Sequence, residues 1–195
     1  MPRSDGPNSE QLPNRSGGGI VFGGGTRADG AAPESMADVI AGLRRRWPSG
    51  VAIVTARDAD GGYRGVTVTS LMVVSQEPPI LAIALTEAGS FQRLAIDGAD
   101  LGVSILESTH EFSAERFAGR APVPERRFTG IDHRLEDGIP ILEDPLAWCV
   151  GRVASRQELG DHVLVLLEVT RGNLELDTDD PLLSYEGRYR RLEAG

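Results

Sequence analysis

The sequence predicts a mainly β protein, an antiparallel barrel of six or seven short strands that is closed or nearly closed, with short flanking helices. Two observations support this fold class. Short runs of β-branched and aliphatic residues recur from residue 51 onward, and glycine, proline and aspartate separate them. Only three short stretches show helical spacing of apolar residues. A chain of 195 residues has the length of one domain and can bury a full core.

Composition excludes several classes of partner. The chain carries 29 Asp and Glu against 20 Lys and Arg, a formal charge of -9, so no basic face is expected and nucleic acid is not a predicted partner. No apolar run reaches the roughly 20 residues that span a membrane, so no membrane partner is expected. A single cysteine, Cys149, cannot form an internal disulfide, which favours the cytoplasm, and its apolar neighbours predict a buried strand residue. The three histidines and this cysteine lack metal-ligand spacing, so no metal site is predicted.

The first 34 residues differ from the rest and predict a disordered leader rich in Gly, Pro and Ser. The glycine-rich stretch 17–25 has no strand before it and no Gly-Lys-Ser/Thr after it, so it is not read as a phosphate loop. The folded domain is therefore expected over residues 35–195. Ser35, with Asp38 three residues later, resembles a capping box and begins a helix. The helix carries Val39, Ile40, Leu43 and Trp47 at helical spacing and ends at residues 48–50. The basic run 44–46 is interpreted as a solvated helix end.

The predicted strands follow in chain order. Residues 51–56 and 64–69 form a hairpin around a glycine-containing turn at 58–62. Further strands are expected at 80–85, 101–106, 148–154 and 162–170, and residues 188–192 are a candidate for a short last strand.

Two short helices interrupt the strands. The first is expected from Ser90 to Gly98, and the second from the capping box Ser108…Glu111 to Gly119. Residues 120–145 are rich in Pro, Arg and Asp and predict a long irregular excursion, a feature that is usually functional or ordered by a partner.

Three places have residue types suited to ligand binding. In strand 64–69, Thr67 and Thr69 share one face and Ser70 follows, so a row of small hydroxyls can meet a polar ring edge; threonine is also simply common in strands. Ser90, as a helix N-cap, would offer backbone N–H groups to a phosphate, or would only stabilise the helix. His162 follows Gly160-Asp161 and opens a strand, where its imidazole can donate to a nicotinamide or flavin atom, or only cap a turn.

Taken together, these segments resemble the short-chain flavin reductase family, which is built on the FMN-binding split barrel, an antiparallel Greek-key β-barrel. The resemblance spans roughly residues 36–192. It rests on residues 65–70 with Pro78-Pro79, on Gly160-Asp161-His162, and on the segment Pro-Leu-Leu-Ser-Tyr-Glu-Gly-Arg-Tyr at 181–189. It implies an NAD(P)H:flavin oxidoreductase that transfers hydride from NADH or NADPH to FMN, with FAD possible, and supplies a flavin-dependent monooxygenase component. It also implies a homodimer, because split barrels of this type bury the flavin partly against a second subunit.

The resemblance implies a set of site residues by position. Flavin contacts fall on Tyr63, Arg64, Gly65, Val66, Thr67, Thr69, Ser70, Ala84, Leu85 and Thr86, with phosphate contacts on Gly89 and Ser90 and a further flavin contact on Arg116 and Phe117. His162 is implied as the catalytic residue on the nicotinamide side, next to the nucleotide region Ser184, Tyr185, Glu186 and Gly187.

The sequence also departs from the family pattern. Ser184 and Glu186 stand where relatives often have an aromatic residue and an arginine, and loop 86–90 lacks the basic residue that many relatives have. Weak FMN binding would suit a reductase that releases its flavin. Two alternatives stay open: a split-barrel oxidase that retains its FMN, and a non-catalytic flavin-binding protein on the same barrel.

Overall fold

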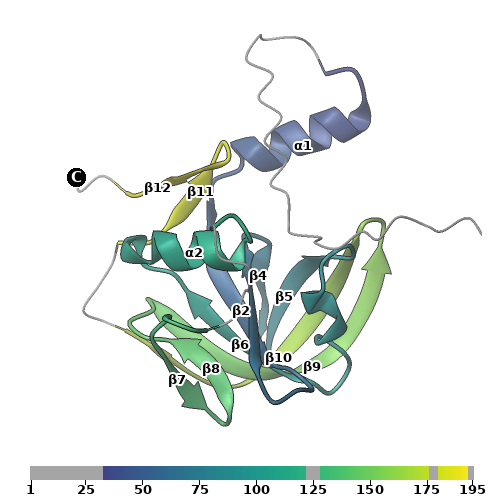
Figure 1. Ribbon diagram of the computed structural model, residues 1–195. Coiled ribbons are helices and arrows are strands. Elements are labelled where there is room, and N and C mark those ends of the chain that lie inside the picture. The colour runs from purple at the N-terminus through teal and green to yellow at the C-terminus, as the bar shows by residue number, and fades with distance from the viewer. Residues whose placement is uncertain (1–32, 122–127, 176–179, 193–195) are drawn as a thin grey trace, which may run out of the picture.

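The computed structural model describes residues 33–121, 128–175 and 180–192, so almost all of the predicted leader lies outside the described residues. Its centre is a seven-stranded antiparallel sheet in the order β3-β2-β6-β9-β10-β5-β4 (Figure 1). The strands are β2 (Ala52–Arg57), β3 (Tyr63–Val68), β4 (Leu71–Gln76), β5 (Pro79–Thr86), β6 (Asp100–Ile105), β9 (Ala147–Leu159) and β10 (His162–Leu174). The sheet curls until β3, at one edge, contacts β5, beside the other edge. The mainly β prediction with short helices is confirmed.

Smaller elements surround the barrel. The helices are α1 (Met36–Arg46), α2 (Glu111–Phe117) and two 3₁₀ helices, η1 (Phe91–Arg93) and η2 (Ser108–His110). A three-stranded sheet joins β1 (Ser49–Gly50), β11 (Leu183–Tyr185) and β12 (Arg188–Arg190), and β7 (His133–Glu136) pairs with β8 (Ile139–Leu142). Because β1 follows α1 and pairs with β11, the two ends of the described chain meet on one side of the barrel (Figure 1).

The core follows from strand alternation. In β2, Ala52, Val54 and Ala56 point into the barrel, while Ile53 points outward to a second cluster around Phe117 of α2. Both faces are buried because α2 and the β7–β8 hairpin cover the outside, so β2 appears as one continuous apolar run in the sequence. The buried Thr55 hydroxyl donates to the Pro140 carbonyl oxygen at 2.6 Å, which ties β2 to the hairpin.

The β7–β8 hairpin corrects the prediction that residues 120–145 are irregular. Its turn is Asp137-Gly138, with φ of 51° and 80°, the backbone geometry that Asp-Gly favours in two-residue hairpins. Ile139 and Ile141 then pack on Trp148 and Val150 of β9. The Pro- and Arg-rich flanks hid this short Asp-Gly signal.

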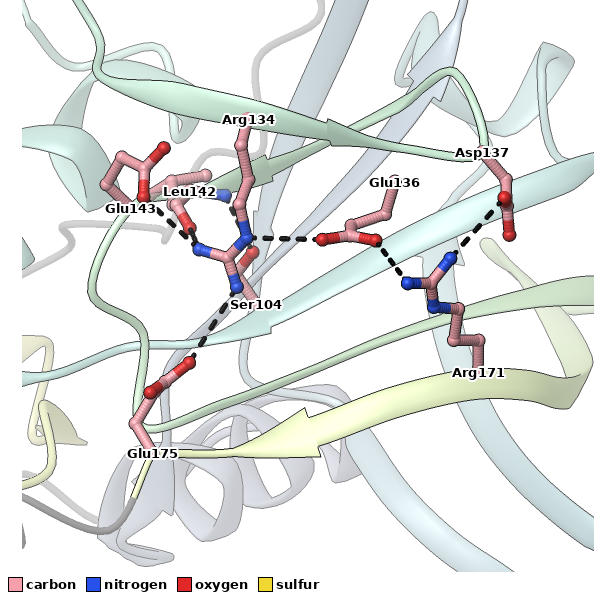
Figure 2. A network of polar contacts seen from close by, with 8 residues as sticks. All are labelled: Ser104, Arg134, Glu136, Asp137, Leu142, Glu143, Arg171 and Glu175. Carbon is pink, nitrogen blue, oxygen red and sulfur yellow. Dashed lines mark hydrogen bonds and ion pairs between the residues drawn. The ribbon is translucent and has the colours of Figure 1, made fainter.

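A network of charged side chains fastens this hairpin to the barrel (Figure 2). Arg134 lies 3.3 Å from Glu136, 3.2 Å from Glu143 and 3.7 Å from Glu175. Arg171 of β10 reaches the other oxygen of Glu136 at 3.3 Å. Two arginines thus hold the carboxylates of the hairpin and of the segment after β10.

Three local predictions were wrong. Residues 71–76 form strand β4, although no strand was expected between residues 69 and 80. β4 pairs with β5 while half or more of the Met72, Val73 and Val74 surface stays exposed. The helix expected from Ser90 is only the three-residue η1, whose Ser90 makes no side-chain cap, because one turn suffices to bury Phe91. Ser108 is no capping box either. Its hydroxyl bonds Asp180 at 2.5 Å, and η2 precedes α2.

Helix α1 begins as predicted, with the Ser35 hydroxyl accepting from the Asp38 backbone N–H at 3.1 Å. No residue of α1 is buried, however. Its apolar residues Met36, Ile40 and Leu43, and Trp47 after it, are 61% to 76% exposed. An isolated helix of this length is marginal in water, so this apolar face is available to a ligand or to a second molecule.

Candidate functional site

A cavity with a volume of about 1110 Å³ is lined by residues of α1, α2 and the β11–β12 hairpin together with residues of β3 and β5. Its lining comes from segments far apart in the sequence: Ile40, Leu43, Arg44 and Arg45 of α1 with Trp47 and Ser49 after it, residues 67–70 at the end of β3, Ala84 and Thr86 of β5, Glu111, Glu115 and Arg120 near α2, His162, and the hairpin residues 184 and 186–189. Cavities of this size hold a ligand larger than a typical drug molecule.

The strand wall of the cavity carries hydroxyl groups. The Thr67 hydroxyl donates to the Ala114 carbonyl at 2.7 Å, and the Ser70 hydroxyl donates to the Ala84 carbonyl at 2.7 Å. Thr67 is 1% exposed, so its hydrogen bond ties β3 to α2. Ser70 is exposed and its proton is engaged, so its oxygen can only accept a hydrogen bond from a ligand. Val66 and Val68 point into the barrel core, which confirms the predicted alternation of this strand. The wall therefore suits a ligand that has N–H groups along its edge.

His162 lies at the start of β10, paired in register with Thr86, and lines the same cavity. Its Nδ1 lies 2.7 Å from an Asp161 carboxylate oxygen. This hydrogen bond holds the pKa of Asp161 below its usual value. A carboxylate at Nδ1 keeps the proton on that nitrogen, so Nε2 is the ring atom left for a ligand.

The cavity lining also contains Glu115, Arg120 and Tyr189, three residues that the sequence reasoning missed. Arg120 bonds both carboxylate oxygens of Glu115, and its Nη2 donates to the Tyr189 hydroxyl at 2.8 Å. The Arg120 hydrogen bond lowers the pKa of Glu115, and burial raises the pKa of Tyr189. These contacts fix the β11–β12 hairpin to the end of α2. Glu115 and Arg120 are five residues apart at a helix end, a spacing that gave no signal in the sequence.

Helix α1 provides the remaining wall, with Ile40, Leu43, Arg44, Arg45 and Trp47. The interpretation of residues 44–46 as a solvated helix end therefore holds for Arg46, which is exposed and does not line the cavity, but Arg44 and Arg45 do line it. The apolar spacing of α1 was visible in the sequence, but its burial partner was not.

Nine of the predicted site residues line the cavity: Thr67, Thr69, Ser70, Ala84, Thr86, His162, Ser184, Glu186 and Gly187. The other ten do not: Tyr63, Arg64, Gly65, Val66, Leu85, Gly89, Ser90, Arg116, Phe117 and Tyr185. Val66 and Leu85 belong to the barrel core, and Phe117 is fully buried in the outer cluster.

Other partners occupy several of these ten residues. A Cβ on Gly65 would come within 2.7 Å of the Phe117 ring, so this glycine allows close packing between β3 and α2. Tyr63 packs edge-on against Phe128, and Arg64 pairs with Asp58 at 2.6 Å. Because η1 is so short, the helix-dipole argument for a phosphate at Ser90 does not apply.

The donor set of the cavity fits a nucleotide with a flat polar ring. Apolar side chains from α1 can cover a ring face, hydroxyl oxygens can meet its N–H edge, and arginines can meet a phosphate. Within the described ranges, no group of three or more His, Cys, Asp or Glu is placed to hold a metal ion. Nor does any helix in the described part have the length and apolar character needed to cross a membrane.

Comparison with known proteins decides the family. The family model described as "Flavin reductase like domain" matches residues 44–193. The chain belongs to the flavin reductase family. The matched range contains every residue that lines the cavity except Ile40 and Leu43 of α1.

Individual relatives agree with the family. The chain is 34% identical over 170 residues to the NADH:FMN oxidoreductase of Rhodococcus erythropolis, covering 83% of this chain and 86% of the relative. It is 32% identical over 145 residues to the 4-hydroxyphenylacetate 3-monooxygenase reductase component of Pseudomonas aeruginosa, covering 73% and 84%. Among solved structures, it is similar to the Streptomyces globisporus NADH:FAD oxidoreductase SgcE6 in complex with NAD and FAD fragments. That match has a TM-score of 0.72 and 28% identity and covers 84% of this chain and 98% of that structure.

Proposed function

We propose that this protein is an NAD(P)H-dependent flavin reductase that supplies reduced FMN to a separate monooxygenase. The observation that carries the proposal is the single cavity of about 1110 Å³ that brings together the strand hydroxyls, His162 and the β11–β12 hairpin. A cavity of this size can hold two ring systems in contact. The names of the relatives, an NADH:FMN oxidoreductase and a monooxygenase reductase component, support the reaction and the class of partner.

The chemistry comes from the bound nucleotides, because a reduced nicotinamide gives hydride to an oxidised flavin directly. The protein's part is to bind, orient and exclude water. The acceptor oxygen of Ser70 orients the ligand edge that carries N–H groups, while Ile40, Leu43 and Trp47 shield the rings from solvent. His162, held by Asp161 through Nδ1, offers Nε2 as a positioning contact. No acid–base pair is required for this transfer.

The nucleotide choice follows from the relatives. FMN is the proposed flavin, with FAD as a second substrate, since one relative is named for FMN and one solved structure holds FAD fragments. NADH is the proposed reductant, and NADPH is the alternative that the same cavity can take. The single Cys149 is a free thiol, which supports the cytoplasm as the compartment.

A homodimer is proposed as the assembly. Two apolar surfaces, the face of α1 and the exposed part of β4 around Val73, border the cavity region and lack cover within the described chain. β4 is also an edge strand of the main sheet, a position that usually needs protection. A second copy would cover both surfaces.

Steady-state kinetics tests the proposed reaction. Oxidation of NADH and of NADPH is measured with FMN, FAD and riboflavin added in turn, and flavin content is measured after purification. A reductase that releases its flavin is purified nearly flavin-free and turns over only when flavin is added. A protein purified with stoichiometric FMN would favour the oxidase alternative, and flavin binding without NAD(P)H oxidation would favour the non-catalytic alternative.

A further inference from the structure

The end of α1 brings arginines to the cavity that neither the proposed mechanism nor the family comparison uses. Arg44 and Arg45 line the cavity, and the neighbouring Arg46 does not. Basic residues in the last turn of a helix ordinarily offset the helix dipole and remain in solvent. Two consecutive arginines on a cavity wall, one of them half-buried, require a further explanation.

Two contacts locate this turn of α1. The Glu186 backbone N–H donates to the Arg45 carbonyl at 2.7 Å, which joins α1 to the tip of the β11–β12 hairpin. On the other side, Arg44 lines the same cavity as Thr86 and His162, which lie beside the β9–β10 turn. The Asp161 carbonyl accepts from the Glu87 backbone N–H at 3.0 Å. The last turn of α1 therefore adjoins the hairpin tip and lies near the turn that contacts loop 86–90.

The net charge of the cavity lining depends on α1. The cavity lining contains four arginines, Arg44, Arg45, Arg120 and Arg188, and three glutamates, Glu111, Glu115 and Glu186. Without α1 it would contain two arginines against three glutamates, and Arg120 is already paired with Glu115. In a chain with a net charge of -9, such a cavity would repel a phosphate group. Helix α1 reverses the sign of the lining.

We propose that Arg44 and Arg45 bind a phosphate group of the nucleotide substrates. The inference rests on the proposed flavin reductase function and adds a binding role for α1. The ligand chemistry is a phosphate monoester, as in FMN, or a pyrophosphate, as in NADH; both present oxygens that accept charge-assisted hydrogen bonds from guanidinium groups. Each guanidinium has five N–H donors, so a phosphate contact can be added to its present contacts. Neither loop 86–90 nor the hairpin tip 184–187 contains a basic residue.

The test compares Arg44→Gln, Arg45→Gln and the double variant with Arg46→Gln. The Arg46→Gln control removes the same charge from the same helix turn but outside the cavity. Dissociation constants are measured at equilibrium for FMN and riboflavin by flavin fluorescence and for NAD⁺ by calorimetry. Circular dichroism checks folding, which these substitutions should preserve because α1 has no buried residue.

We expect the double variant to weaken binding of FMN, NAD⁺ or both about tenfold or more, with riboflavin binding and the Arg46→Gln control changing by less than about twofold. Loss for FMN alone identifies the flavin phosphate as the ligand, and loss for NAD⁺ alone identifies the pyrophosphate. Unchanged binding of both, equal loss in the control, or equal loss for riboflavin and FMN would overturn the inference. Wild-type NADH oxidation on the same preparations separates the two proposals. If the wild type is active and the double variant binds normally, only the inference fails; if the wild type is inactive with every flavin, the proposed function fails.

Discussion

At the scale of single residues, His162 is the side chain whose role is most open to test. Its Nδ1 is held by Asp161 and its ring lines the cavity beside Thr86. If it positions the nicotinamide, His162→Ala should lower kcat/KM for NADH roughly tenfold to a hundredfold, a loss of about 1 to 3 kcal/mol, while FMN affinity barely changes. NADH kinetics and FMN titration on one preparation measure both effects.

A matched control separates positioning from turn stability. Asp161→Asn keeps a side-chain oxygen that can accept the hydrogen bond from Nδ1–H but removes the negative charge. We therefore expect a smaller loss of kcat/KM for NADH than for His162→Ala. Lower thermal stability with normal kinetics in His162→Ala would instead assign the histidine to capping the turn, and it would remove His162 from the site.

Cys149 predicts a dependence of stability on alkaline pH. It packs against the barrel core, and burial raises the pKa of its thiol from an ordinary 9.0 to about 11. A raised pKa means that the folded state favours the neutral thiol. This contribution is complete below pH 9 and is lost as the pH rises toward about 11, at most about 2 to 3 kcal/mol. The basic residues are all arginines, which do not titrate in this range.

Urea unfolding between pH 8 and pH 11 measures this effect, with Cys149→Ala as the control that lacks it. The wild type should lose more stability than the alanine variant over that interval. If the free energy of unfolding falls equally with pH in the two proteins, the thiol is not shielded as the structure indicates. Rapid reaction of Cys149 with a thiol reagent at pH 8 would show the same.

At the scale of elements, the charged network of Figure 2 should hold the β7–β8 hairpin in place. Arg134→Leu leaves Glu136, Glu143 and Glu175 without their shared cation, and we expect it to lower the free energy of unfolding by about 1 to 2 kcal/mol. Arg152→Leu is the matched control. It removes an arginine from one exposed pair with Asp100, where solvent screens the charges, and should leave the free energy of unfolding almost unchanged. Urea unfolding measures the free energy of unfolding of both variants. Equal losses of stability in the two would contradict a structural role for the network.

The elements also show what the sequence can and cannot predict. The β2–β3 hairpin was predictable because turn 58–62 has glycine where φ is positive, at Gly61, between two apolar runs. Strand β4 was missed because Met72, Val73 and Val74 lack the alternation of a half-buried strand and stay exposed. Within the site, the strand hydroxyls and His162 could be predicted from their neighbours in the sequence, namely the alternation of strand 64–69 and the Gly160-Asp161 turn. Arg120 and Tyr189 could not, since they meet only after the hairpin folds back on α2.

At the scale of the whole molecule, the exposed apolar surfaces predict a two-fold homodimer. Light scattering should give twice the chain mass of 20.9 kDa at micromolar concentration. Val73→Lys places a charge on the exposed edge strand β4 and should shift the protein toward monomer, whereas Leu135→Lys, on the exposed surface of the distant β7–β8 hairpin, should not. A wild-type monomer under these conditions would rule out the predicted dimer.

The proposed reaction requires one cavity to hold flavin and reduced nicotinamide together for direct hydride transfer. Anaerobic rapid mixing of the enzyme and FMN with NADH tests it most directly, because loss of oxidised-flavin absorbance reports the transfer without a monooxygenase or oxygen. We expect flavin reduction to be far faster than without enzyme, its rate to saturate with NADH, and its rate to fall when the transferred hydrogen of NADH is replaced by deuterium. FMN that binds to the protein but is reduced by NADH and NADPH no faster than free FMN would contradict it.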